Sequence, residues 1–333
     1  MKRILPLFLA LALLLTGCTA VSTTETTSQA VSQVDSPSSA PESASSQLES
    51  ISITDSNGSQ ITLDTSAPRV VAAYGSFAEA WLLAGGELVG VTQDALEQRD
   101  LGLPEDIAVV GTVKEPNAEE IIALEPDLVL LASDITAQAD IRDVLENAGL
   151  ACAFFQVDTF ADYAFMMEQL CAVTGREDLY EENVTQVGQQ IEEAQANAAL
   201  SSTRPNVLLI RAFSTGIKAK TDDELAGAIL KDLGAHNIAD DHPSMLEDLS
   251  LEEVIAANPD YIFVTTMGDE QKALEYLNGL IDQNPAWSQL SAVQEDRYIV
   301  LPKDLFHYKP NNRWGESYQY LGEILYPQLF HEE

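Results

Sequence analysis

Two stretches of the chain repeat one pattern: NAEEIIALEPDLVLLAS at residues 117–133 and SLEEVIAANPDYIFVTT at residues 250–266. Each starts at a good helix N-cap residue, Asn117 or Ser250, and continues with two glutamates and an apolar run of helical spacing. Each then breaks at a Pro-Asp pair and ends in a β-rich apolar run. The same helix-then-strand unit therefore occurs twice, and this predicts two similar lobes.

The two glutamates of each copy have different expected roles. Glu120 and Glu253 stand three positions after the N-cap residue, where a capping-box acid accepts a hydrogen bond from the cap N–H. Glu119 and Glu252 lie in the same first turn but point elsewhere. They either complement the helix dipole, which is worth about 0.3–1 kcal/mol for each residue, or remain available to a partner.

The regions around both copies alternate between short strands and helices. A β-hairpin is predicted around Asn57-Gly58, since this dipeptide supplies the positive φ angles of a tight turn. Strands and helices joined by short connections then follow, and the alternation restarts at PNVLLIRAF, residues 205–213. This order indicates an α/β fold in which mainly parallel central sheets are flanked by helices. The N-terminal lobe is predicted at 51–175 and the C-terminal lobe at 203–333.

Residues 176–202 interrupt the alternation and are predicted to form one long interlobe α-helix. At 1.5 Å per residue such a helix is about 40 Å long, roughly the width of a small domain. Its apolar residues form one narrow stripe at close to helical spacing. They are Leu179, Val184, Val187, Ile191, Ala194 and Ala198.

The N-terminus carries export features. Lys2 and Arg3 precede a short apolar run, whereas a membrane-spanning helix needs about 20 apolar residues. The run ends in LTGC, which resembles a bacterial lipobox, so residues 1–17 are predicted to be a signal peptide and Cys18 a lipidation site. The alternative is an ordinary cleaved signal with an incidental cysteine. Residues 18–50, rich in Ser, Thr, Ala and Pro, are predicted to be a disordered, lipid-anchored tether.

Composition excludes several classes of function. The chain has 17 basic and 53 acidic residues, a formal charge of −36, which argues against nucleic acid as a partner. The sequence contains no G-x-S-x-G elbow, P-loop or H-E-x-x-H motif, so no enzyme is expected. Cys152 and Cys171 either form a disulfide outside the cytoplasm or pack as free buried cysteines.

Several segments together resemble a known family. They are TDSNGSQITLDTSAPRVVA, PNAEEIIALEPDLVLL, LSLEEVIAANPDYIFV, GAHNIAD and the long interlobe helix. In this order they resemble substrate-binding lipoproteins of bacterial ABC importers, in the helical-backbone class (class III) that serves siderophores, haem, cobalamin and some metal ions. The resemblance implies a monomer without an intrinsic cofactor, anchored on the extracellular face of the cytoplasmic membrane of a Gram-positive cell.

The resemblance also implies the partners. In this family one glutamate of each lobe pairs with arginines of the ABC permease dimer, which works with an ATPase, and this position corresponds to Glu119 and Glu252. The transported ligand is expected to be a metal chelate. A ferric siderophore is the leading expectation, and cobalamin or haem are the alternatives within the family. A sensing or adhesion lipoprotein of the same fold is the alternative function.

A binding cleft is expected between the lobes, because parallel sheets present ligand sites at the carboxyl ends of their strands. Arg211 and Arg313 are expected to clamp ligand oxygens. Aromatic residues near the same ends are expected to stack on the ligand. The candidate ligand-binding residues are Tyr74, Lys114, Arg211, Phe306, His307, Tyr308, Arg313 and Trp314.

The histidines leave the metal question open. His307 ligates a metal or haem, hydrogen-bonds a ligand oxygen, or simply lies on the loop. His236 and His242 do not have the i, i+4 spacing of helical metal ligands, and no three-histidine constellation is visible in the sequence. A receptor for bare zinc or manganese is therefore disfavoured.

Overall fold

The computed structural model describes residues 50–247, 249 and 251–330, which belong to one compact unit. The predicted signal peptide, the lipidation site Cys18 and nearly all of the predicted tether lie outside the described residues, as does Ser250. Within the described part of the chain, no helix is long and apolar enough to cross a membrane.

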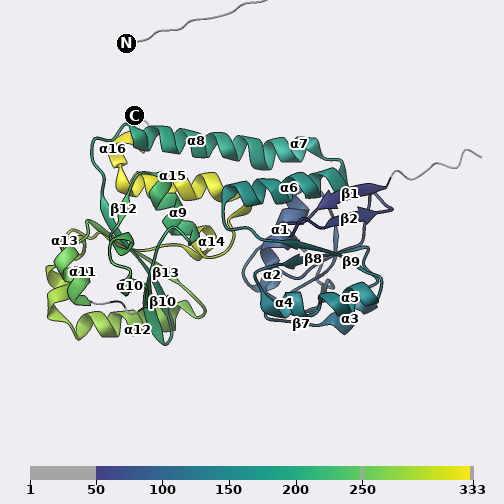
Figure 1. Cartoon of the computed structure of the whole chain (residues 1–333), viewed down its shortest axis with the longest axis horizontal. Coiled ribbons are helices and arrows are strands. Elements are labelled where there is room, and N and C mark those ends of the chain that lie inside the picture. The colour runs from purple at the N-terminus through teal and green to yellow at the C-terminus, as the bar shows by residue number, and fades with distance from the viewer. Residues whose placement is uncertain (1–49, 248, 250, 331–333) are drawn as a thin grey trace, which may run out of the picture. The chain divides into compact units, whose positions relative to one another are not determined.

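The N-terminal lobe has a parallel central sheet with helices on both faces (Figure 1). The strands, in order across the sheet, are β5 (Ala108–Val109), β4 (Leu88–Val91), β3 (Val70–Ala72), β8 (Leu128–Ala132) and β9 (Ala151–Phe155). The helices are α1 (Gly75–Leu83), α2 (Asp94–Glu97), α3 (Ala118–Ala123), α4 (Thr136–Asp140), α5 (Arg142–Asn147) and α6 (Phe160–Thr174). The predicted hairpin is confirmed: β1 (Ile51–Thr54) and β2 (Gln60–Leu63) pair antiparallel around Gly58, whose φ is 79°.

The C-terminal lobe repeats this architecture around a second sheet. Its strands are β11 (Gly216–Lys220), β10 (Asn206–Phe213), β13 (Tyr261–Thr266) and β14 (Tyr298–Val300), with β12 (His236–Asn237) also paired to β10. The helices are α9 (Leu225–Asp232), α10 (Ser244–Glu247), α11 (Leu251–Ala257), α12 (Glu270–Asp282), α13 (Ser291–Gln294), α14 (Lys303–Phe306), α15 (Trp314–Leu325) and α16 (Pro327–Phe330). The described pairings are parallel except that of β11 with β10, a hairpin that the sequence did not predict. The predicted α/β fold with two similar, mainly parallel lobes is confirmed.

The sequence repeat reappears as a repeat of contacts. Asp127 accepts a hydrogen bond from the N–H of Arg69 through Oδ2 at 2.8 Å, and its own N–H donates to the Arg69 carbonyl at 2.8 Å. Asp260 makes the same two bonds with Asn206, at 2.8 and 2.7 Å. Each Pro-Asp break therefore ties the start of one strand to the start of its parallel neighbour.

Helix capping at the first copy differs from the prediction. The Asn117 side chain does cap α3, because it accepts from the N–H groups of Glu119 and Glu120 at 3.1 and 3.3 Å. The predicted reciprocal bond of a capping box, from the Asn117 N–H to Glu120, is wrong. The Asn117 N–H donates instead to the Val110 carbonyl at 2.8 Å. Glu120 is left exposed on the surface.

At the second copy the cap residue Ser250 lies outside the described residues. Glu253 accepts from the hydroxyl of Ser244, at 3.2 and 3.1 Å for its two carboxylate oxygens. This bond connects the first turn of α11 to the start of α10. Glu252, its neighbour, is exposed.

The interlobe segment is helical from Glu177 to Ala199 but not uniform. It comprises α7 (Glu177–Tyr180), a π-helical turn at Glu181–Thr185 and α8 (Gln186–Ala199). Leu179 and Val184 are five residues apart, one more than an α-helix allows for residues on one face, and the π-helical turn accommodates this step. The predicted stripe is buried from Val184 to Ala198, so this side of the helix faces the core.

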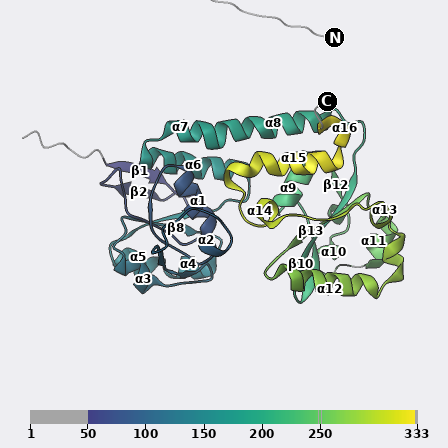
Figure 2. The same ribbon diagram turned by 180° about the vertical axis from the view of Figure 1, so that it is seen from behind.

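One apolar cluster runs through both lobes and this helix. It includes residues from β3 and α6 of the N-terminal lobe, from α8, and from β10 and α15 of the C-terminal lobe. Figures 1 and 2 show α7 and α8 spanning both lobes on the same side, with α15 alongside α8. Each sheet has one further apolar cluster on its opposite face.

The two described cysteines are free. Cys152 lies on β9 in the cluster on the outer face of the sheet, whereas Cys171 lies on α6 in the shared cluster on the opposite face. The sheet therefore separates them, and the free-cysteine alternative is the one that the structure shows.

Asp127→Ala and Asp260→Ala are each expected to lower the free energy of unfolding by about 1 kcal/mol, because each removes a hydrogen bond that fixes a strand start. Chemical denaturation followed by circular dichroism measures the change. Asp106→Ala serves as the control, since Asp106 is exposed and its side chain bonds to no described residue. Equal stability of Asp127→Ala and the control would contradict this role of the repeat.

Candidate functional site

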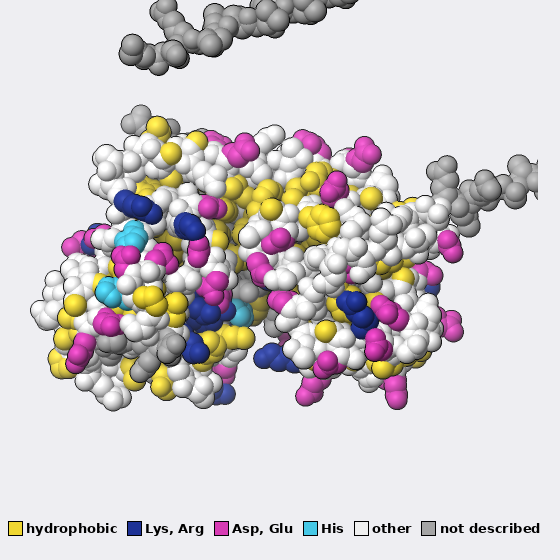
Figure 3. Space-filling model, viewed as in Figure 1, with side chains coloured by type: hydrophobic (Ala, Val, Ile, Leu, Met, Phe, Trp, Pro, Cys, Tyr) yellow, Lys and Arg dark blue, Asp and Glu magenta, His cyan; other side chains and the backbone are white. Residues whose placement is uncertain are grey.

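A cleft of about 790 Å³ lies between the two lobes. Figure 3 shows basic and acidic side chains together where the lobes face each other. Six predicted residues line this cleft: Tyr74, Lys114, Arg211, Phe306, His307 and Tyr308. Tyr74 follows β3 and Arg211 lies near the end of β10, as expected for an α/β binding site, whereas Phe306 ends α14 and is followed by His307 and Tyr308.

The wall of the cleft on the side of the N-terminal lobe is formed by a helix start and a short turn. Tyr74 immediately precedes α1 and follows β3. Lys114 sits in the turn between β6 (Gly111–Thr112) and β7 (Glu115–Pro116), an antiparallel pair that extends the wall. The sharp turn requires Gly111, whose φ is 97° and where an added Cβ would lie 2.4 Å from the Glu115 carbonyl oxygen.

Arg313 and Trp314 do not line the cleft, which corrects the prediction for both. Arg313 is held outside the cleft by ion pairs to Asp304 and Glu316, both at 2.7 Å. Trp314 is 1% exposed and packs edge-on against Phe160 of the N-terminal lobe, with ring centroids 6.4 Å apart. The loop turns away after Lys309, so that Trp314 starts α15 in the core.

The loop after α14 crosses to the N-terminal lobe and is fastened there. Asn311, fully buried and with a φ of 52°, donates from Nδ2 to the Ser76 carbonyl at 2.9 Å and to Glu79 at 2.6 Å. Arg99 donates to the Lys309 carbonyl at 2.8 Å and to the Ser76 hydroxyl at 2.8 Å, and also pairs with Glu79. The loop that carries Tyr308 and Lys309 therefore connects the C-terminal lobe to the N-terminal lobe through these hydrogen bonds.

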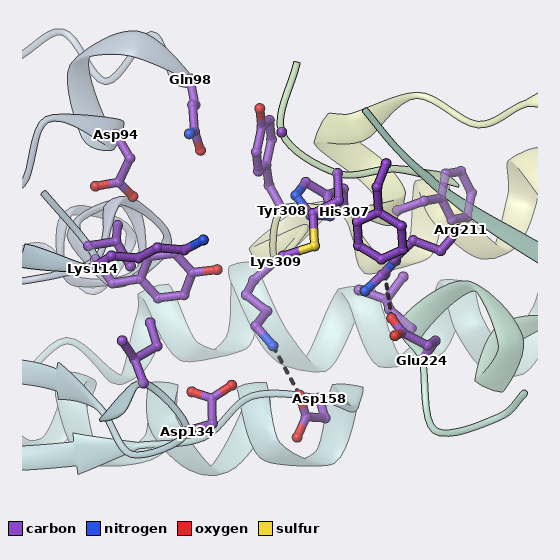
Figure 4. Close-up of a pocket in the computed structure, with 18 of the residues that line it drawn as sticks. Asp94, Gln98, Lys114, Asp134, Asp158, Arg211, Glu224, His307, Tyr308 and Lys309 are labelled. Atoms are coloured by element: carbon purple, nitrogen blue, oxygen red, sulfur yellow. Dashed lines mark hydrogen bonds and ion pairs between the residues drawn. The ribbon is translucent and has the colours of Figure 1, made fainter. Parts of the chain in front are cut away.

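Two cations of the cleft are paired with carboxylates (Figure 4). Arg211 forms an ion pair with Glu224, which also pairs with Lys220 at 2.7 Å. Lys309 pairs with Asp158 across the cleft at 3.0 Å. Burial opposes ionisation of Asp158, but Lys309 and a hydrogen bond from Gln156 outweigh it and lower the pKa of this carboxyl.

The acidic residues of the cleft were missed by sequence reasoning. They are Asp94, Asp134, Asp158, Asp223 and Glu224. Position near the carboxyl end of a strand, which indicated Tyr74 and Arg211, also applies to three of these acids. Asp94, Asp134 and Asp158 closely follow β4, β8 and β9. The predicted ligand-binding residues were basic and aromatic ones at strand ends and did not include acids.

His307 is mostly buried, and burial lowers the pKa of its imidazole to about 4, with Arg211, Lys303 and Lys309 contributing in the same direction. The ring is therefore neutral at pH 7. Its Nδ1 atom is buried and has no hydrogen-bond partner among the described residues. Its ring lies beside that of Tyr308, with centroids 5.3 Å apart.

The phenols of the cleft stay protonated. Burial raises the pKa of Tyr74, and Lys309 opposes this effect only in part. Burial likewise raises the pKa of Tyr308. Both side chains can therefore donate a hydrogen bond or offer an aromatic face at neutral pH. The described residues include no group of three or more His, Cys, Asp or Glu side chains arranged to hold a metal ion.

Comparison with known families identifies the chain. A family model described as periplasmic binding protein matches residues 70–305. This chain belongs to the periplasmic binding protein family. Its fold is that of the class III substrate-binding proteins, and members of this family are transport binding proteins, not enzymes.

Individual relatives agree with this assignment. The Fe(3+)-citrate-binding protein YfmC of Bacillus subtilis is 25% identical over 270 residues, which cover 78% of this chain and 81% of that protein. Staphylococcus aureus IsdE in complex with haem has a TM-score of 0.64 and 19% identity, covering 78% of this chain and 99% of IsdE. Staphylococcus aureus SirA with staphyloferrin B has a TM-score of 0.63 and 20% identity, covering 84% and 99%.

The neutral His307 of this binding protein predicts a pH-dependent stability. Its pKa is 6.5 in the unfolded chain and about 4 in the folded one, so only the unfolded chain takes up a proton between these values. Stability is therefore complete above about pH 6.5 and falls as the pH drops toward 4, by about 2 kcal/mol at pH 5. His307→Gln should remove this contribution.

Chemical denaturation of the parent and His307→Gln at pH 7 and pH 5 measures the difference. The loss of stability on acidification is expected to be smaller in the variant. Identical losses in the two proteins would show that His307 is not held neutral by its surroundings.

Proposed function

We propose that this protein captures a ferric siderophore in the interlobe cleft and delivers it to the permease of an ABC importer. The observation that carries the proposal is the cleft itself. It places the phenols of Tyr74 and Tyr308, the ammonium of Lys114 and the guanidinium of Arg211 around one volume of about 790 Å³. Binding sites for drug-sized ligands have volumes of about 300–1,000 Å³, and the family membership makes a metal chelate the natural occupant.

Haem is the second candidate, and His307 is the observation that favours it. A neutral imidazole that lines the cleft, with an Nδ1 atom that lacks a hydrogen-bond partner among the described residues, has the chemistry of an axial ligand for haem iron. In a siderophore complex the same ring would instead hydrogen-bond a ligand oxygen. Cobalamin remains the third ligand within the family.

The ligand proposal is tested by native mass spectrometry of the purified full chain carrying Cys18→Ala. The panel contains ferric siderophores of several classes, haemin, cobalamin, and free zinc and manganese. A ferric siderophore is expected to form a one-to-one complex that the free metals do not. Exclusive binding of haemin or cobalamin would show that this compound, and not a ferric siderophore, is the ligand. The absence of any complex would overturn the receptor function.

Tyr308→Ala is expected to weaken ligand binding by about 1–2 kcal/mol, roughly tenfold, because an aromatic face against the chelate is lost. Titration calorimetry measures the affinity. Tyr276→Ala is the matched control: Tyr276 is 37% exposed on α12 and does not line the cleft. Equal affinities of the two variants would place the ligand elsewhere.

We propose that Glu119 and Glu252 dock the protein onto the two subunits of the permease. Each is exposed, and each lies in the first turn of the repeated helix of its lobe, α3 or α11. A repeated acidic position suits a partner built from two similar subunits. The proposed lipid anchor on Cys18, followed by the tether, would keep the receptor at the outer face of the cytoplasmic membrane beside this permease.

Glu119→Gln together with Glu252→Gln is expected to reduce uptake several-fold while ligand affinity stays unchanged, because exposed rim charges mainly govern association with the partner. Transport into vesicles with the cognate permease measures the effect. Glu120→Gln with Glu253→Gln carries the same change in charge one residue further along each helix. Normal uptake by the first pair and impaired uptake by the second would reverse the assignment within each doublet.

A further inference from the structure

The charges that line the cleft do not suit a strongly anionic ligand. Among the described residues that line it, three cationic side chains face five carboxylates, and His307 is neutral at pH 7. The cations are Lys114, Arg211 and Lys309, and the acids are Asp94, Asp134, Asp158, Asp223 and Glu224. Like charges disfavour each other at partly buried sites much more than in water. The net negative charge of the lining side chains therefore indicates what charge the ligand has.

Arg211 is already neutralised where it stands. It pairs with Glu224, and both side chains are only 15–16% exposed. Glu224 also holds Lys220 at 2.7 Å, so a ligand anion that displaced Glu224 from Arg211 would leave a buried carboxylate with half of its partners. Lys309 is likewise engaged by Asp158 at 3.0 Å. Lys114 is exposed and forms no ion pair among the described residues.

Asp94 shows the opposite situation. It is 8% exposed, and its Oδ2 accepts the N–H of Gly75 at 2.7 Å at the start of α1. Its Oδ1 has no hydrogen-bond partner among the described residues, although a buried carboxylate oxygen strongly favours one. Asp94 lines the cleft, so the charge of this incompletely paired carboxylate favours a cationic or donor group of the bound ligand on this side. Asp134 adds an exposed carboxylate without an ion pair on the same lobe.

From these observations we infer that the bound chelate is neutral or positively charged and carries a hydrogen-bond donor, such as an ammonium group, toward Asp94. This inference rests on the proposed receptor function. Three monoanionic bidentate groups, such as hydroxamates, exactly balance the charge of Fe³⁺, and a pendant ammonium makes such a complex positive. Catecholates are dianionic and citrates carry several carboxylates, so their ferric complexes are anionic. The cleft selects the first class.

Titration calorimetry of the full chain carrying Cys18→Ala tests the inference with four probes. They are a ferric trihydroxamate with a free ammonium group, a neutral ferric trihydroxamate, a ferric tris-catecholate and ferric citrate. The two trihydroxamates are expected to bind at least roughly tenfold more tightly than the anionic complexes, and the ammonium-bearing one should lose affinity as salt increases. Tighter binding of either anionic complex overturns the inference and leaves the receptor function standing.

Two variants assign the effect to particular groups. Asp94→Asn keeps an oxygen for the Gly75 N–H but removes the charge, and it should weaken the ammonium-bearing complex on the order of tenfold while leaving the neutral one nearly unchanged. Asp143→Asn, on the exposed surface of α5 and outside the cleft, makes the same chemical change and should alter neither affinity. Equal effects of the two variants would contradict the role of Asp94.

Glu224→Gln tests the neutralisation of Arg211 independently. It frees the guanidinium and should strengthen binding of the ferric tris-catecholate relative to the parent. No gain would show that Glu224 does not shield Arg211. Failure of all four probes, with haemin and cobalamin also unbound, would overturn the receptor function and with it the inference.

Discussion

The shared apolar cluster is the constraint on which the rest of the structure depends. Because it passes from β3 and α6 through α8 into β10 and α15, the lobes are packed against common helices as well as connected by the chain. Separating the lobes would expose apolar surface, at roughly 25 cal/mol for each Å². This favours a cleft of nearly constant width, and the ligand must fit a largely preformed space.

Such a preformed space makes the arrangement of charges decisive. A receptor that closes widely can bring new side chains to its ligand, whereas this one must rely on groups already in place. The pairs Arg211–Glu224 and Lys309–Asp158 hold long side chains in fixed positions at the cleft wall and reduce the entropy that ordering would otherwise cost on binding. The same pairing removes much of their attraction for anions. The same ion pairs thus determine both where these cationic side chains lie and how strongly they attract an anion.

Local patterns predicted the fold well because they report local physics. The repeated Pro-Asp units, the hairpin at Gly58 and the stripe from Val184 to Ala198 all act through spacing within one segment. The errors arose where the partner of a group lies outside its own helix or strand. The Asn117 N–H was taken by Val110, so no capping box formed. β11 was missed because its pairing depends on a partner strand rather than on a strong turn signal.

The same distinction applies to the cleft. Strand ends predicted six lining residues, but Trp314 was misplaced because its burial depends on Phe160, far away in the sequence. Arg313 was misplaced because Asp304 and Glu316 hold it outside. Sequence position indicates which residues can reach a strand end, whereas the charge balance of a cleft emerges only when both lobes are placed together.

The fastening of Asn311 has a consequence for the order of assembly. Its bond to Ser76 joins residues 235 positions apart, so this part of the N-terminal lobe cannot be completed until nearly the whole chain has been made. The cleft wall that carries Tyr308 and Lys309 forms at the same late step. A partly synthesised chain, or one shortened before Tyr308, would therefore lack this wall of the cleft. Binding competence in this protein is a property of the finished chain, acquired at the end of folding.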